Sequence, residues 1–400
     1  MDSSNQATTD YRPAVEFSIA QGGPLYQFQR KLGLITDDSW RLGLRVLLLF
    51  LITWGVPFVL ALIAGTATGE STGDPFLLAL NVWVRFVIAT SLMVIMEPRA
   101  EDRLRRVLEQ FFEAPILAPS AFNKATKAVE TACKSRDSML AELVILFLAI
   151  AIILFNYDRV LDQKTASWMI EQSQAGNTLS NAGFWTIAVS GTIFWFLLIR
   201  WVYRLLIWSR LLIKISNVEM RLVAAHPDGY GGLGFVGLFP NAFTGIIFTI
   251  SSVVAAGIAN GLMDGSISST NYAYVMSIWL IIVIAIFAYP LLVFSKPLND
   301  LRERTVLNCN AQATQHFRAQ ERELLGSNVM ATEDADSTPS SEIPDPSKIY
   351  LATMKLNTWL IRRPVLIPVS AAALIPLVIA GLPLLPFKEL FEILKRLVLL

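Results

Sequence analysis

Long apolar runs recur along this chain and constrain its fold more than any other feature. A helix needs about 20 apolar residues to cross the roughly 30 Å hydrocarbon core of a bilayer. A spanning segment must also satisfy its own backbone hydrogen bonds, which favours helices. Six runs approach or exceed this length: 42–65, 75–96, 140–155, 184–206, 235–261 and 272–294. The sequence therefore predicts an all-α integral membrane protein with six or seven transmembrane helices plus a cytoplasmic helical layer.

A seventh apolar run, 365–385, contains three prolines, so it either spans the bilayer or re-enters it. The first span is interrupted by Gly55 and Pro57. Segments 23–35 and 386–400 alternate apolar and charged residues in the manner of amphipathic helices that lie on a membrane surface.

The composition agrees with a membrane protein and excludes several other classes. Charged residues make up 16% of the chain, against about 25% in a soluble domain. A net charge of +1 gives no reason to expect binding to nucleic acid. Two cysteines exclude a disulfide framework. The first 40 residues are polar and mixed in charge, so no cleavable signal is expected.

The distribution of Lys and Arg predicts the orientation. Segments 97–139, 207–241 and 295–363 carry eight, three and nine of these residues, whereas the loops 67–74, 157–183 and 259–273 carry zero, two and zero. Basic loops stay on the cytoplasmic side. We therefore expect a cytoplasmic N-terminus.

These spans and loops divide the chain into eight regions. We expect a cytoplasmic N-terminal segment with an interfacial helix, then alternating membrane and cytoplasmic regions, then a seventh membrane segment with an amphipathic tail. Segment 327–347, acidic and rich in Ser and Pro, is expected to be a disordered linker inside the seventh region. The boundaries are 1–41, 42–96, 97–139, 140–206, 207–235, 236–294, 295–363 and 364–400.

The fourth span turns basic without a helix breaker. From Thr192 to His226 there is no Gly or Pro, so a helix of about 52 Å is allowed, longer than the bilayer core. Five basic residues follow along one arc of roughly 120° on such a helix. They could be a flank that snorkels to lipid headgroups, or a cationic stripe that lines an anion path or docks a partner. The five are Arg200, Arg204, Arg210, Lys214 and Arg221.

The stretch HPDGYGGLGF, 226–235, follows that helix and is the first candidate site. His226 and Asp228 could share a metal or exchange a proton, although two ligands are too few, and no metal or cofactor is assigned. Backbone amides around Gly231, Gly232 and Gly234 could cradle an anion or form a gate. Alternatively, Pro227 stops the helix and Asp228 bonds local amides in a tight turn.

Charged residues in or beside the spans are further candidates. Arg85 lies near the middle of the second span, where an ionisable group is costly and functional by default. It could instead form an internal ion pair that fixes helix packing. A further set should lie near the cytoplasmic face with the HPD stretch and could meet it there: Glu97, Arg136, Asp137 and Glu142.

In the fifth span, Gly257 and Gly261 form a GxxxG pattern, which allows two helix backbones to approach closely. The pattern favours close helix packing, within one chain or between copies.

Several stretches resemble a family of uncharacterised multi-pass inner-membrane proteins of bacteria. The most specific is the HPD motif with GGLGF after a Trp- and Arg-rich helix; others are GPLYQFQRKLGLI, VRFVIATSLMVIMEP, SRDSMLAEL, PLLVFSKPL and PLLPFKELFEILKRL. Relatives usually carry a basic residue and an alanine in place of Gly229 and Tyr230. The resemblance implies location and architecture, and it brings no assigned activity.

No nucleotide-binding, zinc-protease, CxxC or GxSxG motif is present, so no catalytic residue is assigned. The leading hypothesis is a non-enzymatic membrane protein of channel, transporter or sensor type that forms a homo-oligomer in the lipid bilayer. One rival is a membrane-embedded enzyme that uses His226 and Asp228 with Glu97 or Glu142. The other is a scaffold for a cytoplasmic protein partner, held through 297–347.

Overall fold

The computed structural model describes residues 17–37, 39–68, 75–114, 116–161, 168–173, 176–263, 269–331, 338–361 and 363–382. Within these residues, seven helices are long and apolar enough to cross a membrane. They are Leu42–Ile63, Leu80–Glu113, Met139–Tyr157, Asn181–Ser216, Val236–Ala259, Asn271–Leu292 and Arg363–Gly381. The prediction of an all-α, multi-pass membrane protein is confirmed.

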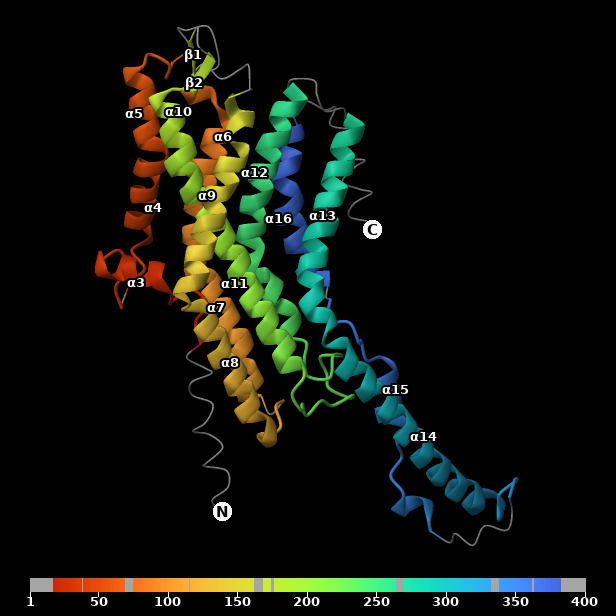
Figure 1. The fold of residues 1–400 in the computed structure, drawn as a ribbon. Helices are drawn as coiled ribbons and strands as arrows, with labels where there is room; N and C mark the ends of the chain where they lie inside the picture. The colour runs from red at the N-terminus through yellow and green to blue at the C-terminus, as the bar shows by residue number, and fades with distance from the viewer. Residues whose placement is uncertain are drawn as a thin grey trace.

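The spanning helices form one bundle (Figure 1). Helices α4 (Leu42–Phe50) and α5 (Val56–Ile63) stand at one edge, next to α7 (Thr90–Glu113), α9 (Met139–Leu161) and α11 (Thr192–Ser216). Helices α12 (Thr244–Met263), α13 (Ser269–Leu292) and α16 (Arg363–Gly381) make up the other side, with α16 packed along α12 and α13. Helix α16 continues through Pro368 and Pro376, so the seventh run is a helix of spanning length.

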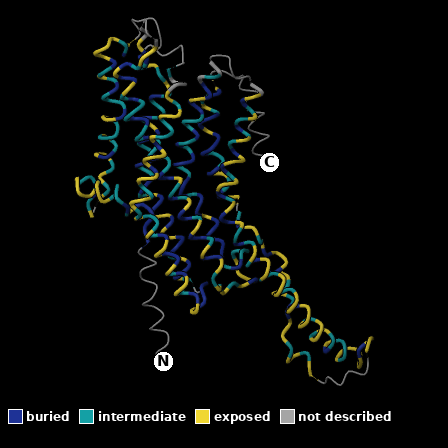
Figure 2. The backbone as a smooth tube through the Cα atoms, in the orientation of Figure 1, coloured by how far each residue is buried: buried dark blue, intermediate teal, exposed yellow. Residues whose placement is uncertain are grey.

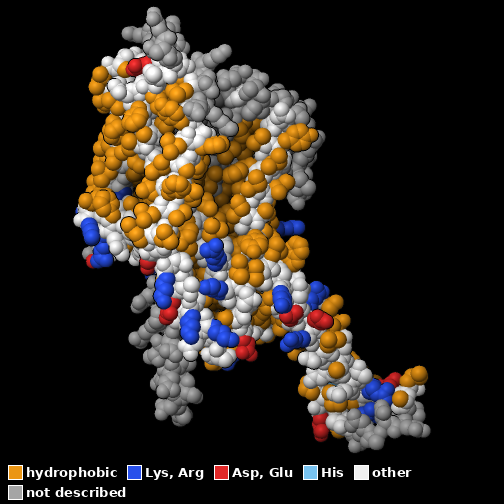
Figure 3. All heavy atoms as spheres, viewed as in Figure 1, with side chains coloured by type: hydrophobic (Ala, Val, Ile, Leu, Met, Phe, Trp, Pro, Cys, Tyr) orange, Lys and Arg blue, Asp and Glu red, His pale blue; other side chains and the backbone are white. Residues whose placement is uncertain are grey.

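Apolar and charged side chains occupy different levels of the molecule. Hydrophobic side chains cover the upper part of the face in Figure 3, and Lys, Arg, Asp and Glu gather below them. In Figure 2 the buried residues run through the centre of the bundle, while the outward faces are intermediate or exposed. Large apolar side chains on those faces are open, as Phe147 at 69% and Ile281 at 65% illustrate. A lipid environment explains this exposure.

The first helix passes through Gly55 and Pro57 without stopping. A π-helical stretch, Leu51–Gly55, precedes α5, and the N–H of Val56 bonds to the carbonyl of Leu51. Pro57 has no N–H to donate to the carbonyls one turn back. Helix α10 (Asn181–Trp185) and the stretch after it supply replacements: Ser190 Oγ donates to Thr53 at 2.8 Å and Trp185 Nε1 donates to Ile52 at 3.0 Å.

The second helix is longer than the sequence suggested. It runs from α6 (Leu80–Val82) through a π-helical stretch, Trp83–Ala89, into α7, with Pro98 inside it. The expected boundary at 96/97 therefore falls inside one continuous helix. Helix α8 (Phe122–Arg136) follows α7 after the 3-10 helix Pro119–Ala121.

The fourth helix ends earlier than its lack of Gly and Pro allowed. Helix α11 stops at Ser216, and the chain then runs beside residues 116–118. Ala118 N–H donates to the carbonyl of Glu219, and Arg221 N–H donates to that of Ile116. These backbone bonds to another part of the chain replace helical ones, so the predicted helix to His226 is wrong.

The remaining elements lie at the two ends of the bundle. A hairpin, β1 (Ile170–Ser173) with β2 (Gly176–Leu179), caps one end. At the other end lies the short helix α3 (Pro24–Lys31), and a 3-10 helix, Val236–Phe243, leads into α12. Helix α14 (Ser295–Leu325) projects away from the bundle, and α15 (Ser347–Met354) packs against it (Figure 1). Of the linker expected at 327–347, the structure describes residues 327–331 and 338–347. Residues 332–337 and the expected amphipathic tail 386–400 lie outside the described part.

Candidate functional site

A buried cluster of charged side chains lies where α4, α7 and α11 meet. Glu97 of α7 forms ion pairs with three arginines: Arg45 at 2.5 Å, Arg204 at 3.0 Å and Arg200 at 3.5 Å. Arg45 comes from α4, whereas Arg200 and Arg204 come from one face of α11, four residues apart. These four side chains are 3% to 7% exposed. We call them, with Glu142, the Arg–Glu cluster.

Glu142 joins the cluster from the first turn of α9, with its Oε1 at 3.5 Å from Arg200 Nε. Even so, the arginines have more donors than these carboxylates bond. Arg45 Nε and Nη1 and Arg204 Nη2 are buried with no hydrogen-bond partner among the described residues. The Arg204 guanidinium lies 5.0 Å from the centre of the Trp201 ring, a cation–π contact. A cluster of this kind is costly to break, because a lone buried charge is left behind.

The N-terminal segment is tied to the same region by carboxylates. Glu101, one turn beyond Glu97, accepts from the backbone N–H groups of Ile19 and Ala20 at 2.8 and 2.9 Å. Glu142 uses its second oxygen to accept from Leu25 N–H at 2.8 Å. Glu142 thus links the start of α3 to Arg200. No sequence pattern predicts this link, because it depends on the backbone of a segment that is distant in sequence.

Arg136 and Asp137, predicted to lie at this face, contact the same N-terminal segment. Asp137 pairs with Arg136 at 2.7 Å and accepts from Gly23 N–H at 2.9 Å, and Arg136 donates to the carbonyl of Ser18. Partial burial works to lower the pKa of Arg136, but the hydrogen bond and the charge of Asp137, with smaller contributions from Cys133 and Glu101, together outweigh burial and raise that pKa. Both residues therefore hold the N-terminal segment.

Arg85 lies farther along the second helix, inside its π-helical stretch. Its guanidinium carbon is 5.5 Å from the centre of the Phe194 ring on α11, and its Nε is buried without a hydrogen-bond partner. No carboxylate among the described residues lies within ion-pair distance of it. The internal ion pair suggested for Arg85 is not formed there.

The π-helical stretch of the first span contacts those of the second and fourth spans, and the one in the second span contains Arg85. Thr53 Oγ1 of the first span donates to the carbonyl of Phe86 in the second at 2.9 Å, and Thr90 Oγ1, on the same helix as Phe86, donates to that carbonyl at 2.7 Å. The Oγ1 of Thr186 is buried with no partner among the described residues. Such π-helical stretches often occur at functional sites, so this level of the bundle is polar as well as irregular.

The HPD stretch forms a tight turn held by Asp228. Its carboxylate accepts from the N–H groups of Tyr230, Gly232 and Gly234 at 2.7, 3.2 and 2.9 Å. Gly231 and Gly232 have φ of +66° and +98°, which favours glycine. Burial acts to raise the pKa of Asp228, but the bonds from these amides outweigh it and lower the pKa. The Asp228 carboxylate thus occupies the amides that were candidates for holding an anion.

His226 bonds within the same turn and does not assemble a larger site. Its Nδ1 lies 2.9 Å from Asp228 Oδ1, and its side chain is 44% exposed. No group of three His, Cys, Asp or Glu side chains suited to a metal occurs among the described residues. Glu97 and Glu142 bond to arginines and backbone instead. The structure does not bring the four residues of the enzyme hypothesis into one site.

The basic stripe of the fourth helix divides into two parts. Arg200 and Arg204 are buried in the Arg–Glu cluster, whereas Arg210, Lys214 and Arg221 are exposed beyond it. The inner pair therefore does not face lipid headgroups. Sequence analysis missed Arg45, although an arginine four residues inside an apolar run was a visible signal.

Gly257 is exposed on α12 and meets no other atoms, whereas Gly245 packs against Met96. The close packing expected at Gly257 is thus not made by the residues that the structure describes.

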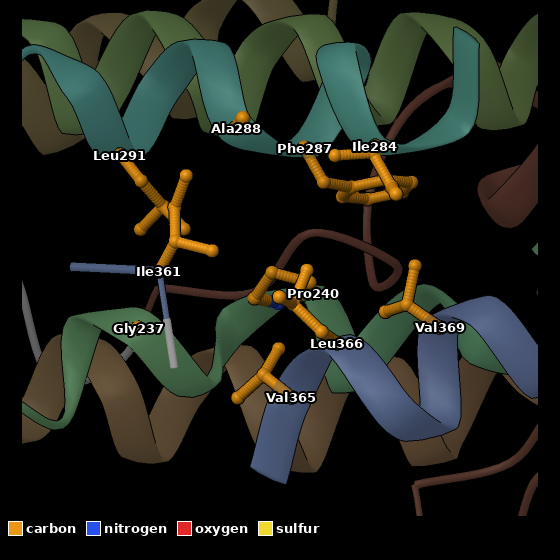
Figure 4. A pocket seen from close by; sticks show the side chains of 10 residues that line it. All are labelled: Gly237, Pro240, Ile284, Phe287, Ala288, Leu291, Ile361, Val365, Leu366 and Val369. Carbon is orange, nitrogen blue, oxygen red and sulfur yellow. The ribbon is translucent and has the colours of Figure 1, made fainter. Parts of the chain in front are cut away.

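Two cavities differ in what they could hold. The crevice of Figure 4 lies between the Val236–Phe243 helix, α13 and the start of α16, and its volume is about 20 Å³. Its lining is apolar, with Phe287, Pro240 and Val365 facing the gap. That volume admits about one water molecule. A second cavity, beside Arg103 and Arg106, has a volume of about 520 Å³.

Comparison of the chain with protein-family models, with curated proteins and with solved structures finds no match. Its function is therefore argued from the geometry of these sites.

Proposed function

We propose that this multi-pass membrane protein is a channel or transporter for small anions. The observation that carries the proposal is Arg85, a cation within the second span that has no carboxylate partner among the described residues. A charged side chain at membrane depth is costly and marks an ion path by default. An anion that passes Arg85 would supply the missing countercharge.

The arrangement of the other cations supports an anion path that runs from Arg85 to the Arg–Glu cluster. Arg85 and Glu97 are 12 residues apart on one helix, or about 18 Å. Over that length the second helix contacts α11, first at Phe194 and then at Arg200 and Arg204. Unused N–H groups of Arg204 and Arg45 lie at the far end. An anion that leaves Arg85 would meet further cationic donors at the Arg–Glu cluster.

Flux through proteoliposomes tests the proposal. The purified protein is reconstituted into liposomes, and efflux of chloride, nitrate and phosphate is measured. We expect anion efflux above that of empty liposomes, reduced at least about tenfold by Arg85→Gln. Arg99→Gln is the matched control, because Arg99 is exposed on the same helix, and it should keep wild-type flux. Wild-type flux equal to that of empty liposomes, or unchanged flux in Arg85→Gln, would contradict the proposal.

The location and assembly of the protein are part of the same proposal. The excess of Lys and Arg in segments 97–139 and 295–363 supports a cytoplasmic N-terminus, and the resemblance of the HPD motif supports a bacterial inner membrane. The open face around Gly257 supports contact between copies of the chain. Cysteine cross-linking through Gly257→Cys would detect such a dimer.

A scaffold for a cytoplasmic partner is the second candidate, and the projecting helix α14 supports it. Large apolar side chains are exposed along α14 and α15, among them Leu307 at 61%, Leu324 at 77% and Leu351 at 60%. Deletion of 327–347 should then leave the membrane helices folded and abolish co-purification of one protein. Co-purification that survives the deletion would count against this role.

A further inference from the structure

A cavity of about 520 Å³ opens where three membrane helices reach the end of their spans. Its walls come from the C-terminal half of α7, from the 3-10 helix Val236–Phe243 with the start of α12, and from Pro368 near the start of α16. This volume lies within the range of small-molecule sites in proteins. The cavity is separate from Arg85 and from the Arg–Glu cluster, none of whose residues line it.

Two arginines form one wall of this cavity. Arg103 and Arg106 are both exposed on α7, and neither lies within ion-pair distance of a carboxylate among the described residues. Arg103 also donates to the backbone carbonyl of Asn241, which holds its side chain across the cavity wall. By contrast Arg105, between them in sequence, pairs with Glu109 at 3.6 Å and does not line the cavity. The cavity therefore concentrates positive charge that no carboxylate in the described part of the chain neutralises.

The other wall is apolar. Leu238, which is 42% exposed, and Pro368 contribute apolar surface beside the two guanidinium groups. Asn241 also lines the cavity, and its Oδ1 is buried with no hydrogen-bond partner among the described residues. The complementary ligand has an anionic oxygen group for the arginines, a donor such as a hydroxyl for Asn241, and an apolar part for the second wall.

We propose that this cavity binds a phosphate group, with an anionic phospholipid as the expected source. Guanidinium groups bind phosphate oxygens through paired, charge-assisted hydrogen bonds. Basic pockets between membrane helices on the cytoplasmic side are suited to lipid headgroups. Phosphatidylglycerol combines a phosphate, headgroup hydroxyls and acyl chains, so it matches all three features of the cavity. Free phosphate would use the same two arginines without the apolar wall.

Lipid counting by native mass spectrometry tests the proposal on the full chain. The protein is prepared in phosphatidylcholine nanodiscs with increasing fractions of phosphatidylglycerol. We expect one retained phosphatidylglycerol per chain, with at least about tenfold weaker retention in Arg106→Gln, since charge-assisted bonds are lost. Arg105→Gln is the matched control and should retain the lipid. Leu238→Trp, which fills the apolar side, should weaken retention without changing the charge.

A second arm uses inorganic phosphate on the protein in phosphatidylcholine alone, followed by ³¹P NMR line broadening. Broadening that Arg106→Gln abolishes, without retention of phosphatidylglycerol, would support the phosphate site and assign it to a soluble ligand. Equal retention and equal broadening in the wild type, Arg106→Gln and Arg105→Gln would overturn the proposal, as would neither ligand binding. The readout is bound ligand, so it is independent of anion flux.

Discussion

Glu97 is the residue at which two arginine-bearing helices meet. Arg45 from α4 and Arg204 from α11 both lie within 3.0 Å of its carboxylate. Three arginines cannot share a buried space with each other unless a carboxylate lies between them. The cluster therefore holds these helices together and is also a candidate anion-binding position. Its removal should lower the free energy of unfolding.

Replacement of Glu97 by Gln should lower the free energy of unfolding by about 3–5 kcal/mol, because buried arginines are left without a countercharge. Equilibrium unfolding in mixed detergent micelles measures it. Glu109→Gln is the control, since the Arg105–Glu109 pair is at the surface and should cost no more than about 1 kcal/mol. Equal costs for the two variants would show that the cluster does not hold the helices together.

Asp228 should make the HPD turn sensitive to acid. Burial opposes ionisation, but the bonds from the amides of the turn leave the pKa of Asp228 below its usual value. A carboxyl with a lowered folded pKa stabilises the turn at pH above its unfolded pKa of about 3.9 and loses this effect as pH falls through the folded pKa.

The hydrogen-exchange protection factors of the amides of Tyr230, Gly232 and Gly234 should therefore be high at neutral pH and fall below about pH 4. Asp228→Ala should speed their exchange at neutral pH, by an opening free energy of about 1–3 kcal/mol, and remove the pH dependence. Asp300→Ala, an exposed carboxylate on α14, is the control. Unchanged protection in Asp228→Ala would mean that the turn is stable without the hydrogen bonds to the Asp228 carboxylate.

In the first span, side chains of a neighbouring helix bond backbone carbonyls that lie one turn before Pro57. Pro57 lacks one N–H and follows a π-helical stretch, and side chains of the fourth span bond the carbonyls of Ile52 and Thr53. We expect the bond from Ser190 to the Thr53 carbonyl to replace the one that Pro57 cannot donate.

A double-mutant cycle tests this dependence. Ser190→Ala should cost about 0.5–1.5 kcal/mol of unfolding free energy in the wild type. In a Pro57→Ala background the helix regains an N–H for the freed carbonyl, so the same change should cost less. The coupling is read from mixed-micelle unfolding of the four proteins. If the two changes in unfolding free energy are strictly additive, the bond from Ser190 does not depend on Pro57.

For the whole molecule, the hairpin β1–β2 and the projecting helix α14 lie at opposite ends of the bundle (Figure 1). We expect the hairpin on the periplasmic side of the membrane and α14 in the cytoplasm, because Lys and Arg concentrate on the side of α14. In a background without Cys133 and Cys309, an impermeant maleimide should label Thr178→Cys on intact cells. It should label Thr314→Cys only after permeabilisation. The reverse pattern would invert the proposed orientation.

The architecture could be read from the sequence because the bilayer imposes a length and a polarity on each span. The apolar runs therefore predicted six spanning helices, and they left open whether the run that contains Pro368 and Pro376 spans the bilayer or re-enters it. The helix end at Ser216 could not be read in this way, because it depends on backbone bonds between 219–221 and 116–118. Nothing local to 217–226 signals those bonds.

The candidate sites follow the same division. The sequence by itself determined that charged residues such as Arg85, Glu97 and Arg200 lie in or beside apolar segments, since composition along the chain fixes depth. Only the tertiary structure decided their partners: Glu97 received three arginines, Glu142 joined Arg200 to the N-terminal segment, and Asp228 bonded its own turn. The partner of each charged side chain depends on which helix faces meet, and the position of a charged residue in the sequence does not predict those contacts.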